Sequence, residues 1–401
     1  MQKKLLALAV AGVLAAPAVA MAQSSVTISG FFKVGIDNYK IDQVAPPASR
    51  FFSTRSSTAG GFNTSETRVT DNSSRLIFGI VEDIGGGLSG IAQIDMRFAP
   101  DVGTLTAAGN TWVGVRSTGF GTVTLGRHDL HYGKQPDDIA AKAGALQASA
   151  TSLMDYVWYG SAIAGATRTN NVVRYDSPNW SGFAFTAAYS ANPTTIEADL
   201  ASPVRKGNAY NFNPSYTASN FGVGWSYWKQ KADAGGVTPT SATVTLTTAA
   251  LPILSADQTS NVFYGYYTVA GFKVGLAVSK SKTETIGVGA VASVKTADRT
   301  NWTVPVSWSA GPHNVYAHYT KAGKDKAADS LGIGDTDAKM LAIAYVYDLS
   351  KRTSVGLTYA KLDNNTNAAY NFHNISAGGA NNVVNPGEDP RLVALTVRHA
   401  F

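Results

Sequence analysis

Residues 301–308 read Asn-Trp-Thr-Val-Pro-Val-Ser-Trp, a stretch in which every second side chain is large and apolar. Successive side chains of a β-strand point to opposite faces of the sheet, so this period of two predicts a strand with one apolar and one polar face. The whole chain is predicted to be all-β, because the same alternation returns along it. It is found in residues 26–36, 221–227, 272–278, 341–347 and 393–401.

Short turns alternate with long polar insertions between these predicted strands. The short turns fall at 85–87, 119–121, 180–182, 219–220, 270–271, 311–312 and 349–351. The long insertions cover about 41–72, 100–108, 130–169, 192–206, 232–258, 283–298, 322–337 and 363–389. Seven turns and eight insertions join sixteen antiparallel strands. Such a sheet can close into a transmembrane β-barrel with short periplasmic turns, long extracellular loops and both termini on one side.

The composition excludes two other classes of protein. Only 15% of the residues are charged, the mean hydropathy is −0.04, and there are 39 Gly, 16 Phe, 18 Tyr and 7 Trp. Soluble domains carry about 25% charged residues, and a helical membrane protein would contain apolar runs of about 20 residues. The strands of a large exported β-sandwich or β-propeller would also alternate between apolar and polar side chains. The sequence, however, shows no repeat of blade length, and its apolar face is rich in aromatic residues near strand ends.

The N-terminus has the pattern of a cleaved signal peptide over residues 1–22. Lys3 and Lys4 precede an apolar stretch that Pro17 ends, and Ala20 and Ala22 provide small residues before the expected cleavage point. The 401 residues less these 22 leave 379, residues 23–401, as one barrel domain, and the charge falls from +6 to +4 with the loss of two lysines. No cysteine is present, so disulfides and thiolate metal ligands are excluded.

Several short strings resemble the Gram-negative porin family of the β-proteobacterial type. They are VTISG at 26–30, SRLIFGIVED at 74–83, FGTVTLGR at 120–127, NVVRYDSP at 171–178, YDLSKRT at 347–353 and RHAF at 398–401. The resemblance implies a sixteen-stranded, homotrimeric barrel of the outer membrane, in which the third loop folds into the lumen. It also implies passive diffusion of small hydrophilic solutes and ions. One departure is that residues 109–114 lack the arginine that the family often carries there.

The resemblance also implies partners. We expect outer-membrane lipid and lipopolysaccharide around the barrel, and the barrel-assembly machinery, which would read the C-terminal Phe401. Phe401 is also expected to be the last lipid-facing residue of its strand, and the two roles are compatible. We expect no nucleic acid, cofactor or metal ion as a partner.

Charges of opposite sign are predicted to face each other across the pore. An Arg or Lys that faces lipid near the midplane costs about 2–4 kcal/mol, so the polar parity of the strands predicts lumen-facing cations. These are Lys33, Arg75, Arg97 and Arg174. The resemblance adds Arg168 at the end of the third loop, whose acidic candidates are Asp137, Asp138 and Asp155. Asp137 could instead cap a short helix over 137–148, and any of these charges could form ordinary salt bridges.

A constriction of this kind filters solutes by charge. Lys134, Lys142 and the positive net charge favour a weak preference for anions. No catalytic motif occurs, so an enzyme is not expected. A substrate-specific channel and a surface adhesin barrel are the alternatives, and conductance across a planar bilayer distinguishes them.

Overall fold

The protein is described by a computed structural model. It describes residues 24–42, 65–106, 109–131, 133, 134, 136, 142, 144, 148–158, 168–193, 207–231, 256–285, 294–373 and 384–401. The predicted signal peptide and the candidates Asp137 and Asp138 lie outside these residues. No helix in the described part of the chain is long and apolar enough to cross a membrane.

Most of the described residues, and all of the strands among them, belong to one antiparallel sheet. Its strands are β1 (Ser25–Ile41), β2 (Ser65–Asp71), β3 (Arg75–Gly85), β4 (Leu88–Ala99), β5 (Thr104–Thr106), β6 (Thr111–Ser117), β7 (Gly121–His128), β8 (Thr169–Asp176), β9 (Phe183–Ser190), β10 (Asn208–Thr217), β11 (Phe221–Lys231), β12 (Ala256–Val269), β13 (Phe272–Thr285), β14 (Val294–Ala310), β15 (His313–Ala322), β16 (Ala338–Asp348), β17 (Thr353–Asn364) and β18 (Pro390–Ala400). Two short helices, α2 (Thr151–Met154) and α3 (Lys326–Ser330), lie in loops.

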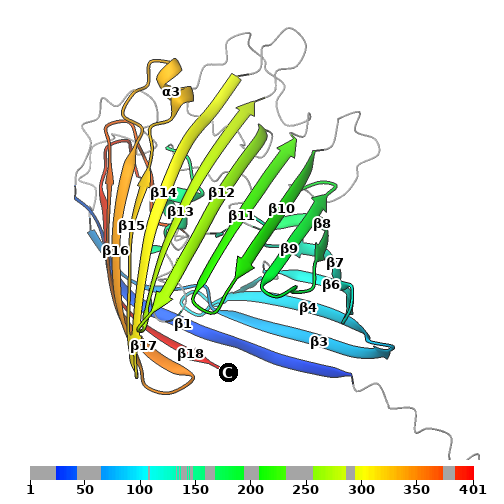
Figure 1. The fold of residues 1–401 in the computed structure, drawn as a ribbon. Helices are drawn as coiled ribbons and strands as arrows, with labels where there is room; N and C mark the ends of the chain where they lie inside the picture. Colours follow the sequence, from blue (N-terminus) through cyan, green and yellow to red (C-terminus); the bar gives the residue numbers. More distant parts are fainter. Residues whose placement is uncertain are drawn as a thin grey trace, which may run out of the picture.

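These eighteen segments form sixteen barrel strands, as the sequence predicts. Both β2 and β3 pair with β1, and both β5 and β6 pair with β4, so each of these two couples is one barrel strand with an interruption. Each strand otherwise pairs with its neighbour in sequence, and the sheet closes where β18 pairs with β1. The sheet is a closed barrel with tilted strands (Figure 1).

The period of two separates the two faces of this wall. On β1, Val26, Ile28, Phe32 and Ile36 are exposed on the outer face, whereas the alternate residues from Lys33 to Ile41 are buried on the inner face. An exposed apolar face with no second sheet against it is the lipid-facing band of a transmembrane barrel. The seven predicted turns are confirmed, since each falls between two consecutive strands.

The predicted insertions at 41–72 and 100–108 were too long. The first contains β2, and the second contains β5. Both strands are short and are separated from the next segment by an irregular stretch. The strict alternation of side chains, from which the strands were predicted, is lost there.

Loop three joins β7 to β8 over residues 129–168, and its described residues fill part of the barrel. Its helix α2 packs against β14, β15 and β16, which lie roughly opposite β7 and β8 in the strand order. Leu153 and Trp158 of loop three are buried with Met340, Leu362 and other small or apolar residues on the inner face of β15–β18. The hydrophobic core of this barrel is therefore inside the lumen, between the loop and one wall.

Candidate pore constriction

The first arm of loop three is held by a buried histidine. The two ring nitrogens of His131 lie 2.8 Å from the hydroxyl oxygens of Ser226 on β11 and Ser260 on β12. Its ring also stacks on Trp228, with 6.3 Å between the centroids. Burial lowers the pKa of His131 to about 3, so the ring is neutral at physiological pH and makes one hydrogen bond as donor and one as acceptor.

Further along, loop three descends toward the turns. The ammonium group of Lys142 donates to Asp348, 2.8 Å away, at the end of β16. Pro136 approaches Gly275 on β13 so closely that a Cβ atom on the glycine would lie 2.6 Å from the Cγ of Pro136. The absence of a side chain at Gly275 therefore lets the loop lie directly on the backbone of the wall.

The second arm of loop three carries Asp155, whose side chain is buried and 6% exposed. Burial raises its pKa to about 7, and the guanidinium group of Arg299 on β14 opposes that rise. Arg299 donates to the hydroxyl of Tyr370 at 2.8 Å and to the carbonyl of Met154 at 3.3 Å. The side-chain amide of Asn301 donates to the carbonyl of Leu153 at 2.6 Å. This arm is therefore held against β14 by several polar contacts.

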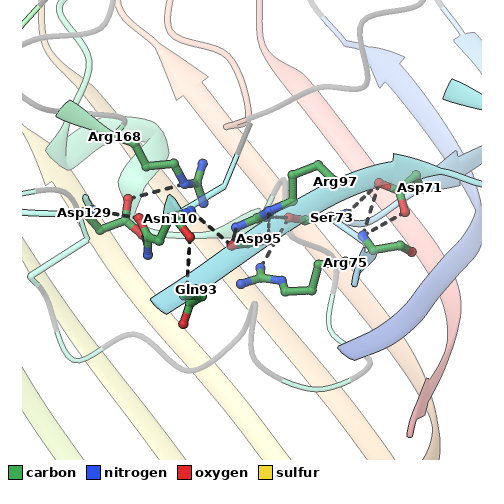
Figure 2. Close-up of polar contacts among 10 residues, drawn as sticks. Asp71, Ser73, Arg75, Gln93, Asp95, Arg97, Asn110, Asp129 and Arg168 are labelled. Atoms are coloured by element: carbon green, nitrogen blue, oxygen red, sulfur yellow. Dashed lines mark hydrogen bonds and ion pairs between the residues drawn. The ribbon is translucent and has the colours of Figure 1, made fainter. Parts of the chain in front are cut away.

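The inner faces of β1, β3, β4, β8 and β18, together with Arg168, form a surface that we call the basic wall. Figure 2 shows its central part, where Arg75 on β3 and Arg97 on β4 lie directly opposite each other in register. Asp95 accepts two hydrogen bonds from Arg97, at 2.9 and 3.0 Å. The hydroxyl of Ser73 accepts from both arginines, at 2.5 Å from Arg97 and 3.4 Å from Arg75.

Arg168 and Arg174 continue this wall. Arg168 lies 3.6 Å from Asp129, whose other oxygen accepts from the amide of Asn110 at 3.0 Å (Figure 2). Arg174 makes two hydrogen bonds of 2.8 Å with Asp176, two residues further along the same strand. These ion pairs keep the arginines extended along the wall.

On the other side of Arg75, the wall continues through the closure of the barrel. Lys33 on β1 is opposite Arg398 on β18 in register, and the lysine is 1% exposed. The guanidinium groups of Arg75 and Arg398 lie 4.8 and 4.5 Å from the centroid of the Phe31 ring. Phe31 is therefore stabilised by cation–π contacts with two arginines.

The comparisons with known proteins agree with this geometry. A family described as Gram-negative porin matches residues 7–367. The chain is a Gram-negative porin. Over the full length of both chains, this porin is 28% identical to outer membrane porin protein 32 of Delftia acidovorans. It is also 26% identical to the major outer membrane protein P.IB of Neisseria lactamica, over 88% of this chain and 91% of that protein.

Solved structures show the same fold. The porin superposes on the anion-selective porin of Comamonas acidovorans with a TM-score of 0.70 and 20% identity, covering 94% of this chain and 100% of that one. It superposes on OmpT of Vibrio cholerae with a TM-score of 0.59 and 15% identity, covering 94% and 98%. This porin is an outer-membrane diffusion channel, and its family consists of channels rather than enzymes.

The structure distributes the predicted site residues over two groups. Arg75, Arg97 and Arg168 lie together in the centre of the basic wall (Figure 2), and Lys33 on β1 and Arg174 on β8 belong to its two sides. Asp155 is instead buried beside Arg299 on another part of the lumen. Sequence reasoning missed Arg398, Asp95 and Asp129 as parts of the wall. Each of the first two has the polar parity of its strand, which was a usable signal, but Asp129 lies in a loop that has no parity.

Sequence reasoning also missed a second loop inside this porin. In loop eight, residues 365–389, the backbone nitrogen of Ala369 donates to the carbonyl of Trp158 at 2.6 Å. The backbone nitrogen of His373 donates to Ser152 at 2.8 Å. Loop eight thus packs on loop three.

At 109–114, where the arginine often found in the family is lacking, Trp112 faces the lumen. Its ring stacks on that of His128, with 6.0 Å between the centroids.

Proposed function

We propose that this porin is a general diffusion pore with a weak preference for anions, and that its constriction lies between loop three and the basic wall. The observation that carries the proposal is an excess of positive charge on that wall. Arg97, Arg168 and Arg174 are paired with carboxylates. In the described part of the chain, neither Arg75 nor Arg398 forms an ion pair, and the Nε atom of each is buried without a hydrogen-bond partner.

An uncompensated guanidinium group at the edge of a narrow aqueous pore attracts anions and repels cations. We include Lys33, Arg75, Arg97, Arg168 and Arg174 as constriction residues, and we add Arg398. On the loop side, Asp137 and Asp138 are the proposed acidic counterparts, so that a transverse field acts on passing solutes. The third acidic candidate, Asp155, is buried beside Arg299 and is proposed to act within the loop rather than on the solutes. The carboxylates paired with Arg97, Arg168 and Arg174 weaken this electric field. The selectivity for anions is therefore proposed to be modest.

Reversal potentials across a planar bilayer in a KCl gradient test this proposal. The wild-type channel is expected to be more permeable to chloride than to potassium. Arg75→Gln and Arg398→Gln are each expected to reduce that ratio by about twofold or more. Lys324→Gln is the matched control, because Lys324 is an exposed cation that pairs with Asp335 in an extracellular loop. A cation-selective wild-type channel would refute the anion preference.

The same recordings separate a general pore from a substrate-specific channel. A general pore is expected to give a conductance that rises linearly with salt concentration and is not blocked by any one solute at low concentration. The ratio of permeabilities is also expected to approach one near 1 M salt, where the Debye length falls to about 3 Å. Absence of conductance would favour the adhesin alternative.

The remaining partners are part of the same proposal. We propose a homotrimer in the outer membrane, surrounded by lipid and lipopolysaccharide, with residues 1–22 removed as a signal peptide. Phe401 is the proposed signal for the barrel-assembly machinery. It follows β18 directly, and its backbone nitrogen donates to the carbonyl of Gly30 at 3.2 Å. A Phe401→Ala variant is expected to give fewer assembled barrels in the outer membrane.

A further inference from the structure

The second barrel strand contains an extra residue at the height of the basic wall. Asp71 at the end of β2 pairs with Val34, and Arg75 at the start of β3 pairs with Phe31. Three residues, 72–74, therefore lie opposite the two residues 32 and 33 of β1. This is the geometry of a β-bulge, in which one strand has one residue more than its partner. We call residues 71–74 the β2–β3 bulge.

The bulge reverses the parity of the strand. Before it, Arg68 shares the lumen face with Asp37, with which it makes hydrogen bonds of 2.8 and 3.0 Å. After the bulge, the odd-numbered residues face the lumen, and Arg75 is the first of them. If the same residues continued from Asp71 in regular pairing, Arg75 would lie opposite Gly30 and face lipid, at a cost of about 2–4 kcal/mol. The bulge therefore allows Arg68 and Arg75 to face the lumen from one strand.

Ser73 occupies the centre of the bulge in a conformation that is uncommon for serine. Its φ angle is 69°, in the left-handed region. The carboxylate of Asp71 holds this conformation, because it accepts from the backbone nitrogens of Ser73 at 2.9 Å and Ser74 at 3.0 Å. Lys33 fixes the bulge to β1, since its backbone nitrogen donates to the hydroxyl of Ser74 at 2.9 Å and its carbonyl accepts from Asn72 at 2.7 Å.

The left-handed backbone places the hydroxyl of Ser73 between two like charges. Arg75 and Arg97 are directly opposite in register, where like charges repel each other. The Ser73 oxygen accepts from Nη1 of Arg97 and Nη2 of Arg75. Asp95 neutralises Arg97 from the other side. Among the described residues, the side chain of Arg75 is held on this side of the wall by this hydroxyl and by the Phe31 ring.

We propose that Ser73 is a positioning residue that sets the charge selectivity of the pore by holding Arg75 and Arg97 side by side on the lumen surface. This inference rests on the proposed function, because it concerns the same constriction. Without the hydroxyl, Arg75 relaxes away from Arg97, and the positive charge at the pore surface becomes more diffuse. The backbone bulge and the ion pair with Asp95 remain.

Ser73→Gly is the decisive substitution, because glycine adopts the left-handed conformation without strain and the hydroxyl is the only polar group that is lost. The chloride-to-potassium permeability ratio is expected to change by about twofold or more, with the melting temperature of the barrel equal to or above that of the wild type. Ser73→Asn is expected to restore the ratio, because asparagine tolerates this conformation and provides an oxygen that accepts hydrogen bonds. Ser181→Gly is the matched control, since Ser181 has a φ angle of 51° in a distant turn.

A double-mutant cycle separates positioning from a general structural effect. In an Arg75→Gln, Arg97→Gln background, Ser73→Gly is expected to have no further effect on the ratio. An equal effect in both backgrounds would overturn the proposal, as would a Ser73→Gly channel with the wild-type ratio. The two proposals fail differently. The sign of the wild-type preference tests the proposed function, whereas the difference between Ser73→Gly and the wild type tests the role of Ser73.

Discussion

The carboxyl group of Asp155 is a buried titratable group of loop three, and it should make the stability of the barrel depend on pH. Burial raises its pKa from 3.8 to about 7. Between these values the folded protein binds a proton that the unfolded chain releases, so the free energy of unfolding falls as the pH rises from about 4 to 7 and is constant above. Asp155→Asn is expected to remove this component.

The measurement is the temperature at which the barrel unfolds, recorded between pH 4 and 8 for the wild type and the variant. Relative to the wild type, the variant is expected to unfold at a higher temperature as the pH rises. At pH 7 the corresponding gain in the free energy of unfolding is about 1–3 kcal/mol. Asp335→Asn is the control, because Asp335 is exposed and paired with Lys324. A constant difference across this range would show that Asp155 is ionised in the folded protein.

At single residues, parity predicts the face of a side chain but not its partner. Lys33, Arg75, Arg97 and Arg174 have the polar parity of their strands, and the structure places them on the inner face. Which carboxylate each one meets depends on the register between strands and on the bulges, and no short pattern in the sequence reveals either. The roles of these residues in the constriction stay predictions.

Among the elements, the contact between β13 and loop three should control the width of the pore. Gly275→Ala adds a methyl group where the Cγ of Pro136 would be 2.6 Å and that of Pro305 3.0 Å away. Because the wall is a continuous sheet, the loop is expected to move instead, toward the lumen. The single-channel conductance should decrease by about a tenth to a half.

Gly79→Ala is the matched control for this prediction. Gly79 is also on the inner face of a strand, but the nearest atom to an added Cβ is the carbonyl oxygen of Thr27 at 4.0 Å. Its conductance is expected to equal that of the wild type. An unchanged conductance for Gly275→Ala would mean that the segment around Pro136 moves without narrowing the pore.

The strands and turns were predictable because each depends on local sequence. Alternation identifies the strands, and the seven tight turns are marked by glycine, proline, serine or asparagine. The interruptions at β2–β3 and β5–β6 were not predictable in the same way, since a bulge breaks the alternation on which the prediction depends. The inward fold of loop eight was missed because it depends on contacts with loop three, such as that between Ala369 and Trp158.

The outer surface of the whole molecule is divided into two kinds of face, which supports the proposed trimer. In the described residues, the outward side chains of β1, β3–β7 and β18 include no Tyr or Trp. From β8 to β17, the outer face carries many of both, among them the exposed Tyr189 and Tyr345 and the half-buried Trp225 and Trp302. Tyr and Trp mark contact with the membrane interface. The face without Tyr or Trp is therefore the expected contact between subunits.

A pair of matched leucines tests this assignment. Leu125 on the face without Tyr or Trp and Leu276 on the face that carries them are 52% and 51% exposed in the single chain. Leu125→Gln is expected to lower the temperature at which the trimer dissociates, because a polar group would be buried between subunits. Leu276→Gln is expected to leave that temperature nearly unchanged. Gel electrophoresis without prior boiling measures it, and equal effects would place the subunit contact elsewhere.

The pairing of β1 with β18 has a consequence for how the protein is made. Phe31 on β1 is the register partner of Ala400 on β18, so the seam of the barrel joins residues from near the two ends of the chain. Contacts between residues this far apart in sequence have a large entropic cost of loop closure, and they form slowly. The edge of β1 that will pair with β18 therefore stays unpaired until β18 has been synthesised and has reached it. An unpaired edge invites aggregation, so a chain of this topology requires protection throughout its transit to the membrane.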